Sequence, residues 1–215
     1  MIFHTFGDDY NPAILLIHGV LTPWQIWEDA IRQFSKESCV IVPALDAHTE
    51  EEQSVFESVD KEVLLIEEHI IGNHGGKVSM VCGLSMGGLI AAKLAAKGSI
   101  EIETLVLDGA PLIKVPGIAT RIMQSTYLSI IRRSQKREPK IIKSFKKTFL
   151  PKKHLDSYLK IADNMTDESI RNMIGSVCKG FDFVSYSPDM KILFMHGTKG
   201  NEEIKKKAAK KLKKM

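Results

Sequence analysis

Ser85 is the residue whose type and sequence neighbours most clearly suggest chemistry. It stands at the centre of a Gly-x-Ser-x-Gly pattern that starts at Gly83 and ends at Gly87, between an apolar run typical of a strand and a helical pattern. A serine on such a sharp turn exposes its hydroxyl, and the free N–H groups of the helix can stabilise an oxyanion. The glycines let strand and helix approach closely. The pattern therefore predicts a serine nucleophile.

Apolar runs and helical patterns alternate through the first half of the sequence and must position this serine. The predicted strands cover residues 13–19, 39–46, 77–83 and 102–110, and the predicted helices cover residues 23–37, 49–73 and 87–97. Short continuous apolar runs are typical of strands buried on both sides. Their alternation with helices predicts an α/β fold with a mostly parallel sheet and helices on both faces.

The pattern changes in the second half of the sequence. From Pro111 to Pro188 only basic amphipathic helices are indicated, near 128–131, 141–150, 151–165 and after Thr166. Strand character returns at residues 191–197, and a lysine-rich helix at 202–215 follows it. We therefore predict an α/β core of residues 1–110 and 189–215, interrupted by a helical cap at residues 111–188.

Composition narrows the class of protein. Apolar residues make up 44% and charged residues 26% of the chain, as in ordinary globular proteins. No apolar run is long enough for a membrane span, and the first residues do not resemble a secretion signal. The three cysteines are odd in number and widely spaced, which favours a cytoplasmic location. No phosphate loop, dinucleotide fingerprint or metal-ligand cluster is recognisable, so no cofactor and no metal site are predicted.

Charge is distributed unevenly along the chain. The net charge is −11 over residues 1–110, +8 over 111–190 and +7 over 191–215. The basic surplus could attract an anionic substrate or contact an anionic membrane surface, or it could be a solvated face that complements the acidic half. Nucleic acid is not a predicted partner, because aromatic residues are not interleaved with the basic ones and no binding motif is present.

The order of these motifs resembles that of the α/β-hydrolase superfamily. The stretches that carry the resemblance are LIHG at 16–19, DAH at 46–48, GLSMG at 83–87, LVLDGAP at 105–111 and ILFMHGTKG at 192–200. The resemblance implies that Ser85 is the nucleophile and that the backbone N–H groups of Met86 and of Val20, or alternatively Leu21, form the oxyanion hole. It also implies that His18 shapes its loop rather than acting as a base.

The acid and the base of the expected catalytic triad are not in their usual places. In the superfamily an aspartate follows the strand that here ends at His196, and a histidine follows one more strand. The position corresponding to the acid is Gly200, and Asn201, Glu202 and Glu203 come next. No histidine follows residue 196.

Three explanations remain open at this point. The chain could be part of a longer hydrolase, which we favour, or it could be a non-catalytic binding protein on the same fold. Alternatively, His48 or His154 could supply the base, and Asp108 is a second candidate for the acid. We expect a serine hydrolase that cleaves a small carboxylic ester or thioester through an acyl-enzyme on Ser85.

Overall fold

The structure is a computed structural model that describes residues 1–148, 151–183, 186–187, 189–197 and 202–213, with the backbone alone for 146–148 and 202–205. The strands are β1 (Ile2–Phe6), β2 (Ala13–Ile17), β3 (Cys39–Ala44), β4 (Lys77–Leu84), β5 (Glu101–Asp108) and β6 (Lys191–Met195). The helices are η1 (Trp24–Trp27), α1 (Glu28–Phe34), α2 (Val59–His74), α3 (Met86–Lys97), α4 (Gly117–Gln135), α5 (Pro139–Thr148), η2 (Lys152–His154), α6 (Leu155–Asn164), α7 (Asp167–Lys179) and α8 (Glu202–Leu212).

The strands form one sheet in the order β1-β3-β2-β4-β5-β6. All neighbouring pairs are parallel except β1 and β3, which run antiparallel from Ile2 opposite Ala44 to Phe6 opposite Val40. The mostly parallel sheet predicted from the sequence is confirmed. Strand β1 was not predicted, because it is a half-buried edge strand without a continuous apolar run.

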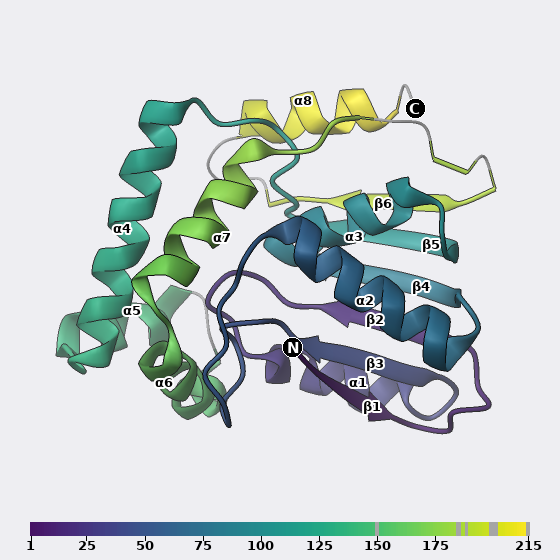
Figure 1. Cartoon of the computed structure of the whole chain (residues 1–215), viewed down its shortest axis with the longest axis horizontal. Coiled ribbons are helices and arrows are strands. Elements are labelled where there is room, and N and C mark those ends of the chain that lie inside the picture. The colour runs from purple at the N-terminus through teal and green to yellow at the C-terminus, as the bar shows by residue number, and fades with distance from the viewer. Residues whose placement is uncertain (149–150, 184–185, 188, 198–201, 214–215) are drawn as a thin grey trace.

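Helices cover both faces of the sheet, as Figure 1 shows with α1 behind it and α2 and α3 in front. Alternating side chains of β2 explain the two layers, since Leu15 and Ile17 join one hydrophobic cluster while Ile14 and Leu16 join another. The first cluster includes the buried side chains of α2 and α3, and the second includes Ile31 of α1. Ser85 thus stands at the end of a central strand that is covered on both sides.

Residues 49–58 correct the sequence prediction, because the expected helix over 49–73 begins only at Val59. The hydroxyl of Ser58 accepts the backbone N–H of Lys61 at 3.1 Å and caps the start of α2. The preceding segment instead bonds to the helices after β5. Phe56 N donates to the Ser169 hydroxyl at 3.1 Å, and Asn172 donates to the carbonyl oxygen of Phe56 at 3.1 Å.

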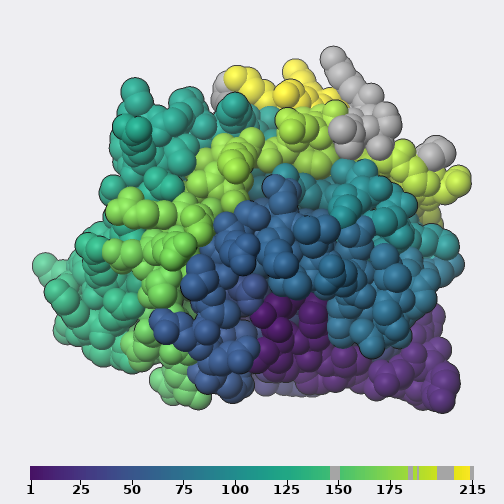
Figure 2. Space-filling view, in the orientation of Figure 1, coloured from purple at the N-terminus to yellow at the C-terminus, as the bar shows by residue number. Residues whose placement is uncertain are grey.

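A second group of hydrogen bonds completes this contact. The amide of Asn164 donates to the carbonyl oxygens of Thr49 and Glu50 at 3.3 and 3.2 Å, and Gln53 donates to the carbonyl oxygen of Asn164 at 3.2 Å. Figure 2 shows the green α6 and α7 lying directly against this blue segment. Backbone groups that would bond within a helix are therefore used to attach the inserted helices to the core.

The inserted helices α4 to α7 lie between β5 and β6, where helical structure was predicted. The hydroxyl of Thr166 caps α7 by accepting the N–H of Ser169 at 3.1 Å. Most of their buried apolar residues belong to the same hydrophobic cluster as the sheet and α2, so the division into a core and a cap remains a prediction. On α8, Ala208 and Leu212 are buried as predicted, whereas the side chain of Ile204 and residue Met215 lie outside the described part.

No helix in the described residues combines the length and apolar character that crossing a bilayer requires.

Candidate active site

Ser85 lies on the sharp turn between β4 and α3, with φ of 53° and ψ of −115°. A non-glycine residue with this backbone is strained by about 1–3 kcal/mol. The turn is held by hydrogen bonds on both sides, since Ser85 N donates to the carbonyl oxygen of Asp108 at 2.7 Å and Gly88 N donates to that of Ser85 at 2.9 Å. The strained turn predicted around Ser85 is therefore present.

The glycines of the pattern are sterically required. A Cβ atom on Gly83 would lie 2.2 Å from the carbonyl oxygen of Gly87, and one on Gly87 would lie 2.2 Å from that of Ile17. These distances are far below van der Waals contact, so a side chain at either position would push β4, α3 and β2 apart. The two glycines are therefore needed because β4, α3 and β2 meet closely beneath Ser85.

The loop after β2 approaches the same serine. A Cβ atom placed on Gly19 would lie 3.2 Å from the Cβ of Ser85. The loop turns back on itself, since Gly19 N donates to the Thr22 hydroxyl at 2.9 Å and Leu21 has a left-handed backbone with φ of 56°. Gly19, which precedes Val20, is thereby held against Ser85.

Two backbone N–H groups beside Ser85 remain free for a ligand. Within the described residues, neither Val20 N nor Met86 N has a hydrogen-bond acceptor, and Met86 is the first residue of α3. Leu21, the alternative to Val20, donates its N–H to Nε2 of His48 at 3.1 Å and is not available. Of the two positions that the sequence left open, Val20 is therefore the one whose N–H has no acceptor within the described residues.

His18 and His48 hold this loop through hydrogen bonds to its backbone. Nε2 of His18 accepts the N–H of Leu45 at 3.2 Å, which leaves the Nδ1 proton to bond the carbonyl oxygen of Gly19 at 3.0 Å. In His48, Nε2 is occupied by Leu21 and Nδ1 lies 3.1 Å from the carbonyl oxygen of Asp46. Both rings are buried, with their centroids 4.8 Å apart.

The environment keeps both imidazoles neutral. Burial lowers the pKa of His48 to about 4. Burial, and then the neighbouring His48, lowers the pKa of His18 well below its usual value. Because both nitrogens of His48 already bond the backbone, it shapes the loop and does not act as the base in this conformation. The expectation that His18 has a loop-shaping position agrees with its contacts.

His154, the other candidate base, lies in η2 beside α1. The charges that act on it come from Lys153, Glu28 and Asp29, and its pKa is lowered mainly by burial. Among the described residues, none makes a hydrogen bond to the hydroxyl of Ser85, which is half-buried. In the described part of the chain, no group that could accept its proton is hydrogen-bonded to the Ser85 hydroxyl.

Solved structures with similar folds come from several hydrolases. An α/β-hydrolase family protein of Desulfitobacterium hafniense is 19% identical, with a TM-score of 0.68 over 99% of this chain and 97% of that one. A carboxylesterase structure from Nitrososphaera gargenis is 13% identical, with a TM-score of 0.71 over 100% and 83%. A thermophilic esterase from Thermogutta terrifontis is 16% identical, with a TM-score of 0.63 over 99% and 93%.

The chain has the α/β-hydrolase fold. No protein-family model matches the sequence, and no curated protein sequence matches it. At these identities the likeness establishes the fold, while the chemistry must be argued from the site.

A catalytic triad on the α/β-hydrolase fold needs an acid as well as a base, and Asp108 is the candidate within the described residues. Asp108 contributes its carbonyl oxygen to the turn of Ser85, and its charge, after burial, raises the pKa of Cys82 to about 11. In the described residues its carboxylate bonds no histidine. Gly200 and Asn201 lie outside the described residues, as do the side chains of Glu202 and Glu203.

A hollow beside Val20 and Leu21, in the loop after β2, is a feature that the sequence did not reveal. It has a volume of about 370 Å³, and the residues that line it are Val20, Leu21, Tyr127, Ile130, Ile141, Ser144 and Phe145. The loop residues and the α4 and α5 residues are more than 100 positions apart in the chain. A weak signal was the amphipathic pattern of α4 and α5, which marks their apolar faces but not what those faces meet.

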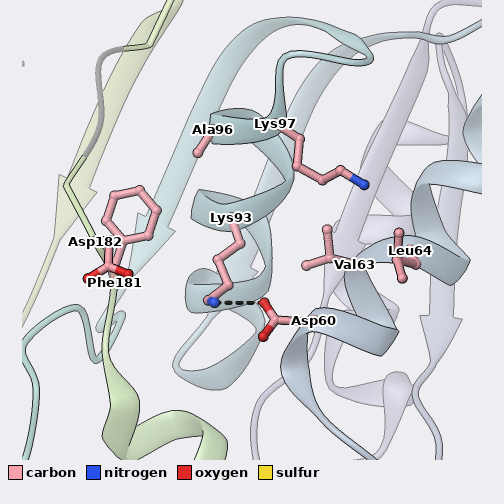
Figure 3. A pocket seen from close by; sticks show the side chains of 8 residues that line it. All are labelled: Asp60, Val63, Leu64, Lys93, Ala96, Lys97, Phe181 and Asp182. Carbon is pink, nitrogen blue, oxygen red and sulfur yellow. Dashed lines mark hydrogen bonds and ion pairs between the residues drawn. The ribbon is translucent and has the colours of Figure 1, made fainter.

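A second hollow, shown in Figure 3, lies between α2, α3 and the segment after α7. Its volume is about 450 Å³, and Asp60 and Lys93 in its wall bond each other at 2.7 Å. These charges neutralise each other, and Ser85 is not among the lining residues. Among the described residues, no group of three histidine, cysteine or acidic side chains is placed to hold a metal ion.

Proposed function

We propose that this chain is a serine hydrolase that cleaves a small carboxylic ester or thioester through an acyl-enzyme on Ser85. The observation that carries the proposal is the combination of a strained Ser85 backbone with two free N–H groups beside it. Backbone strain of this kind is stored where function needs it. An ordinary glycine turn between strand and helix would not require Ser85 to adopt a left-handed φ.

The proposed reaction has two steps. The Ser85 oxygen attacks the carbonyl carbon, its proton passes to a base, and the N–H groups of Val20 and Met86 stabilise the oxyanion. Collapse of this intermediate breaks the bond to the alcohol or thiol, which leaves with a proton. Water then attacks the acyl-enzyme, a proton of that water passes through the base to the Ser85 oxygen, and the acid is released. The inserted helices serve as a cap over the site.

The backbone N–H groups of the oxyanion hole are positioned before substrate arrives. His48 fixes Leu21, and thereby Val20, while the strand-helix turn fixes Met86. Preorganised donors of this kind are worth about 3–4 kcal/mol each in transition-state stabilisation. A hydrolase that lacks its base still accelerates the reaction on the order of 10³–10⁴-fold over the rate in water, because such groups and substrate binding remain.

A direct test is the hydrolysis of p-nitrophenyl acetate by the chain, by a Ser85→Ala variant and by a Ser79→Ala control. Ser79 lies on the same strand, where its hydroxyl donates to the carbonyl oxygen of Ala13 at 2.8 Å. We expect hydrolysis above the rate in buffer that Ser85→Ala loses and Ser79→Ala retains. Equal rates for the folded chain and its Ser85→Ala variant would refute the proposal.

The second candidate function is binding without turnover on the same fold. It is favoured by the Ser85 hydroxyl, which has no hydrogen-bond partner within the described residues. A binding protein would retain the pocket and the free N–H groups but would leave the ester intact. The hydrolysis assay separates the two functions, because only the hydrolase depends on the Ser85 oxygen.

A further inference from the structure

We propose that Glu62 is a positioning residue of the candidate active site, because it holds the turn at residues 45–48 and this turn holds Leu21 through His48. The proposal rests on the proposed function, since Leu21 follows Val20, whose N–H is the candidate oxyanion donor. Glu62 itself takes no part in the reaction. The hydrogen bonds, the burial of the turn and the charges around Glu62 support this role.

A chain of three hydrogen bonds joins Glu62 to the loop after β2. Oε2 of Glu62 accepts the N–H of Asp46 at 3.2 Å, and the carbonyl oxygen of Asp46 accepts the Nδ1 proton of His48 at 3.1 Å. Nε2 of His48 then accepts the N–H of Leu21 at 3.1 Å. A neutral imidazole has one donor and one acceptor, and these two partners use both. A displacement of Asp46 therefore strains or breaks the bond to Leu21.

The turn at residues 45–48 transmits such a displacement because it is rigid. His48 N donates to the carbonyl oxygen of Leu45 at 2.9 Å, and Ala47 N donates to the Ser54 hydroxyl at 2.9 Å. Ala47 has a left-handed backbone with φ of 62°, and Leu45, Ala47 and His48 are buried. Close-packed interiors of this kind are hard to compress and pass a shift on to their neighbours.

Glu62 fits beside this turn as a neutral carboxyl group. Its side chain is fully buried, and its Oε1 has no hydrogen-bond partner within the described residues. Burial, followed by the charge of Asp46, raises the pKa of Glu62 to about 8. The amine of Met1 acts in the opposite direction, but it is paired with Asp46. An ionised Glu62 would therefore add a second carboxylate to a buried site that already shares one cation.

The remaining charges of the described residues do not compensate that carboxylate. On the far side of the turn, burial lowers the pKa of His18 and His48, so both rings are neutral. The charged side chains on β4, α3 and α7, which pack against α2, are paired elsewhere or exposed: Lys77 with Glu101, Lys93 with Asp60, Lys97 with Glu67, and Asp167, Glu168, Arg171 and Lys179 at the surface. Opening of the turn, which hydrates the carboxylate and releases Leu21, therefore relieves the ionisation of Glu62.

Opening of the turn should become easier as the pH rises. In the opened turn Glu62 regains its ordinary pKa of 4.5, so between pH 4.5 and 8 the opened chain has released a proton that the closed chain still holds. The equilibrium constant for opening then rises by up to about tenfold per pH unit in this window and levels off above it. From pH 6 to pH 8 the rise is about fifty-fold, because the closed form is itself half ionised at the upper end.

Hydrogen exchange of the Leu21 amide, followed by NMR in the full chain from pH 6 to pH 8, measures this opening once the intrinsic exchange rate is divided out. Wild type is compared with Glu62→Gln, which keeps an acceptor for Asp46 N but cannot ionise, and the histidines cancel because both chains contain them. We expect the ratio of opening constants, wild type over variant, to rise by about fifty-fold. Glu67→Gln, on the same helix but bonded to Lys97, should behave like wild type.

The amide of Val81, in the central strand β4, separates opening of the turn from unfolding of the whole chain. Leu21 should exchange faster than Val81 at every pH, because the turn opens while the sheet stays folded. In the His48→Ala background, the Asp46 amide should keep its dependence on Glu62, whereas the Leu21 amide should lose it. A wild-type ratio for Leu21 that changes by less than about threefold, equal protection of Leu21 and Val81, or a dependence of Leu21 that survives in His48→Ala would overturn the inference.

The proposed function is tested separately by hydrolysis of p-nitrophenyl acetate through Ser85, which the exchange experiment does not involve. If Ser85 is required for hydrolysis and the Leu21 amide does not respond to Glu62, the positioning role is wrong and the hydrolase stands. If Leu21 responds to Glu62 and no Ser85-dependent hydrolysis is found, the hold of Glu62 on the loop stands and the hydrolase is wrong.

Discussion

Replacing Glu62 by glutamine should become progressively more favourable to stability as the pH rises from 5 to 8. Glu62 lies on α2 with its side chain fully buried, and its Oε2 accepts the N–H of Asp46 at 3.2 Å. Its Oε1 has no hydrogen-bond partner within the described residues. Burial, followed by the charge of Asp46, raises the pKa of Glu62 to about 8, although Asp46 also pairs with the amine of Met1.

The size and sign of the effect follow from these values. The ordinary pKa of the group is 4.5, so between pH 4.5 and 8 the unfolded chain has released a proton that the folded chain still holds. The free energy of unfolding therefore falls by about 1.4 kcal/mol per pH unit in this window. Glutamine cannot ionise, so the difference between variant and wild type should shift by on the order of 4 kcal/mol in favour of Glu62→Gln from pH 5 to pH 8.

Urea unfolding followed by circular dichroism at pH 5, 6, 7 and 8 measures this difference. Other titrating groups, including the histidines, cancel because they are common to both chains. Glu67→Gln is the matched control on the same helix, since Glu67 bonds Lys97 and the Ser99 hydroxyl and should only lose stability, by about 1 kcal/mol. Parallel stability curves for wild type and Glu62→Gln would refute the reasoning.

Three further predictions test the loop, the turn and the insertion. His48→Ala should lower the free energy of unfolding by about 3 kcal/mol, because it leaves Leu21 N unpaired. In the wild type, the pKa of His48 should make the free energy of unfolding fall by up to about 1.4 kcal/mol per pH unit as the pH falls from 6.5 to 4, and the variant should lack this fall. Urea unfolding midpoints measure both effects. Gly87→Ala should lower the free energy of unfolding by about 3 kcal/mol, measured in the same way; a loss below 1 kcal/mol would contradict the close contact. Tyr158→Phe should cost about 1 kcal/mol in thermal unfolding by removing one bond to Ser134, and no change would show the bond to be unimportant.

The sequence predicts the parallel sheet and the tight turn at Ser85 because local physics determines both. Buried parallel strands need continuous apolar runs, and a turn as tight as that of Ser85 needs glycine at Gly83 and Gly87. Segment 49–58 shows where local reasoning fails. Its composition suits a helix, yet its backbone bonds to residues more than 100 positions away, which no local pattern contains.

The histidines show the same limit at the level of the site. His48 was considered as a base because of its place after a strand, but its role depends on what its two nitrogens bond. Those partners are Leu21 and Asp46, and only the folded chain brings Leu21 to it. The hollow beside Val20 and Leu21 was likewise hidden, because α4 and α5 meet this loop only in the folded chain.

The most direct test of the account is labelling of the intact chain with a small fluorophosphonate, with the modified peptide identified by mass spectrometry. Ser85→Ala and Ser79→Ala are treated in parallel, and circular dichroism confirms that each is folded. The account predicts a phosphonyl adduct on Ser85, unchanged in Ser79→Ala and absent in Ser85→Ala. Unlabelled Ser85 in a folded chain, or equal labelling of several serines, would contradict the claim that Ser85 is an activated nucleophile.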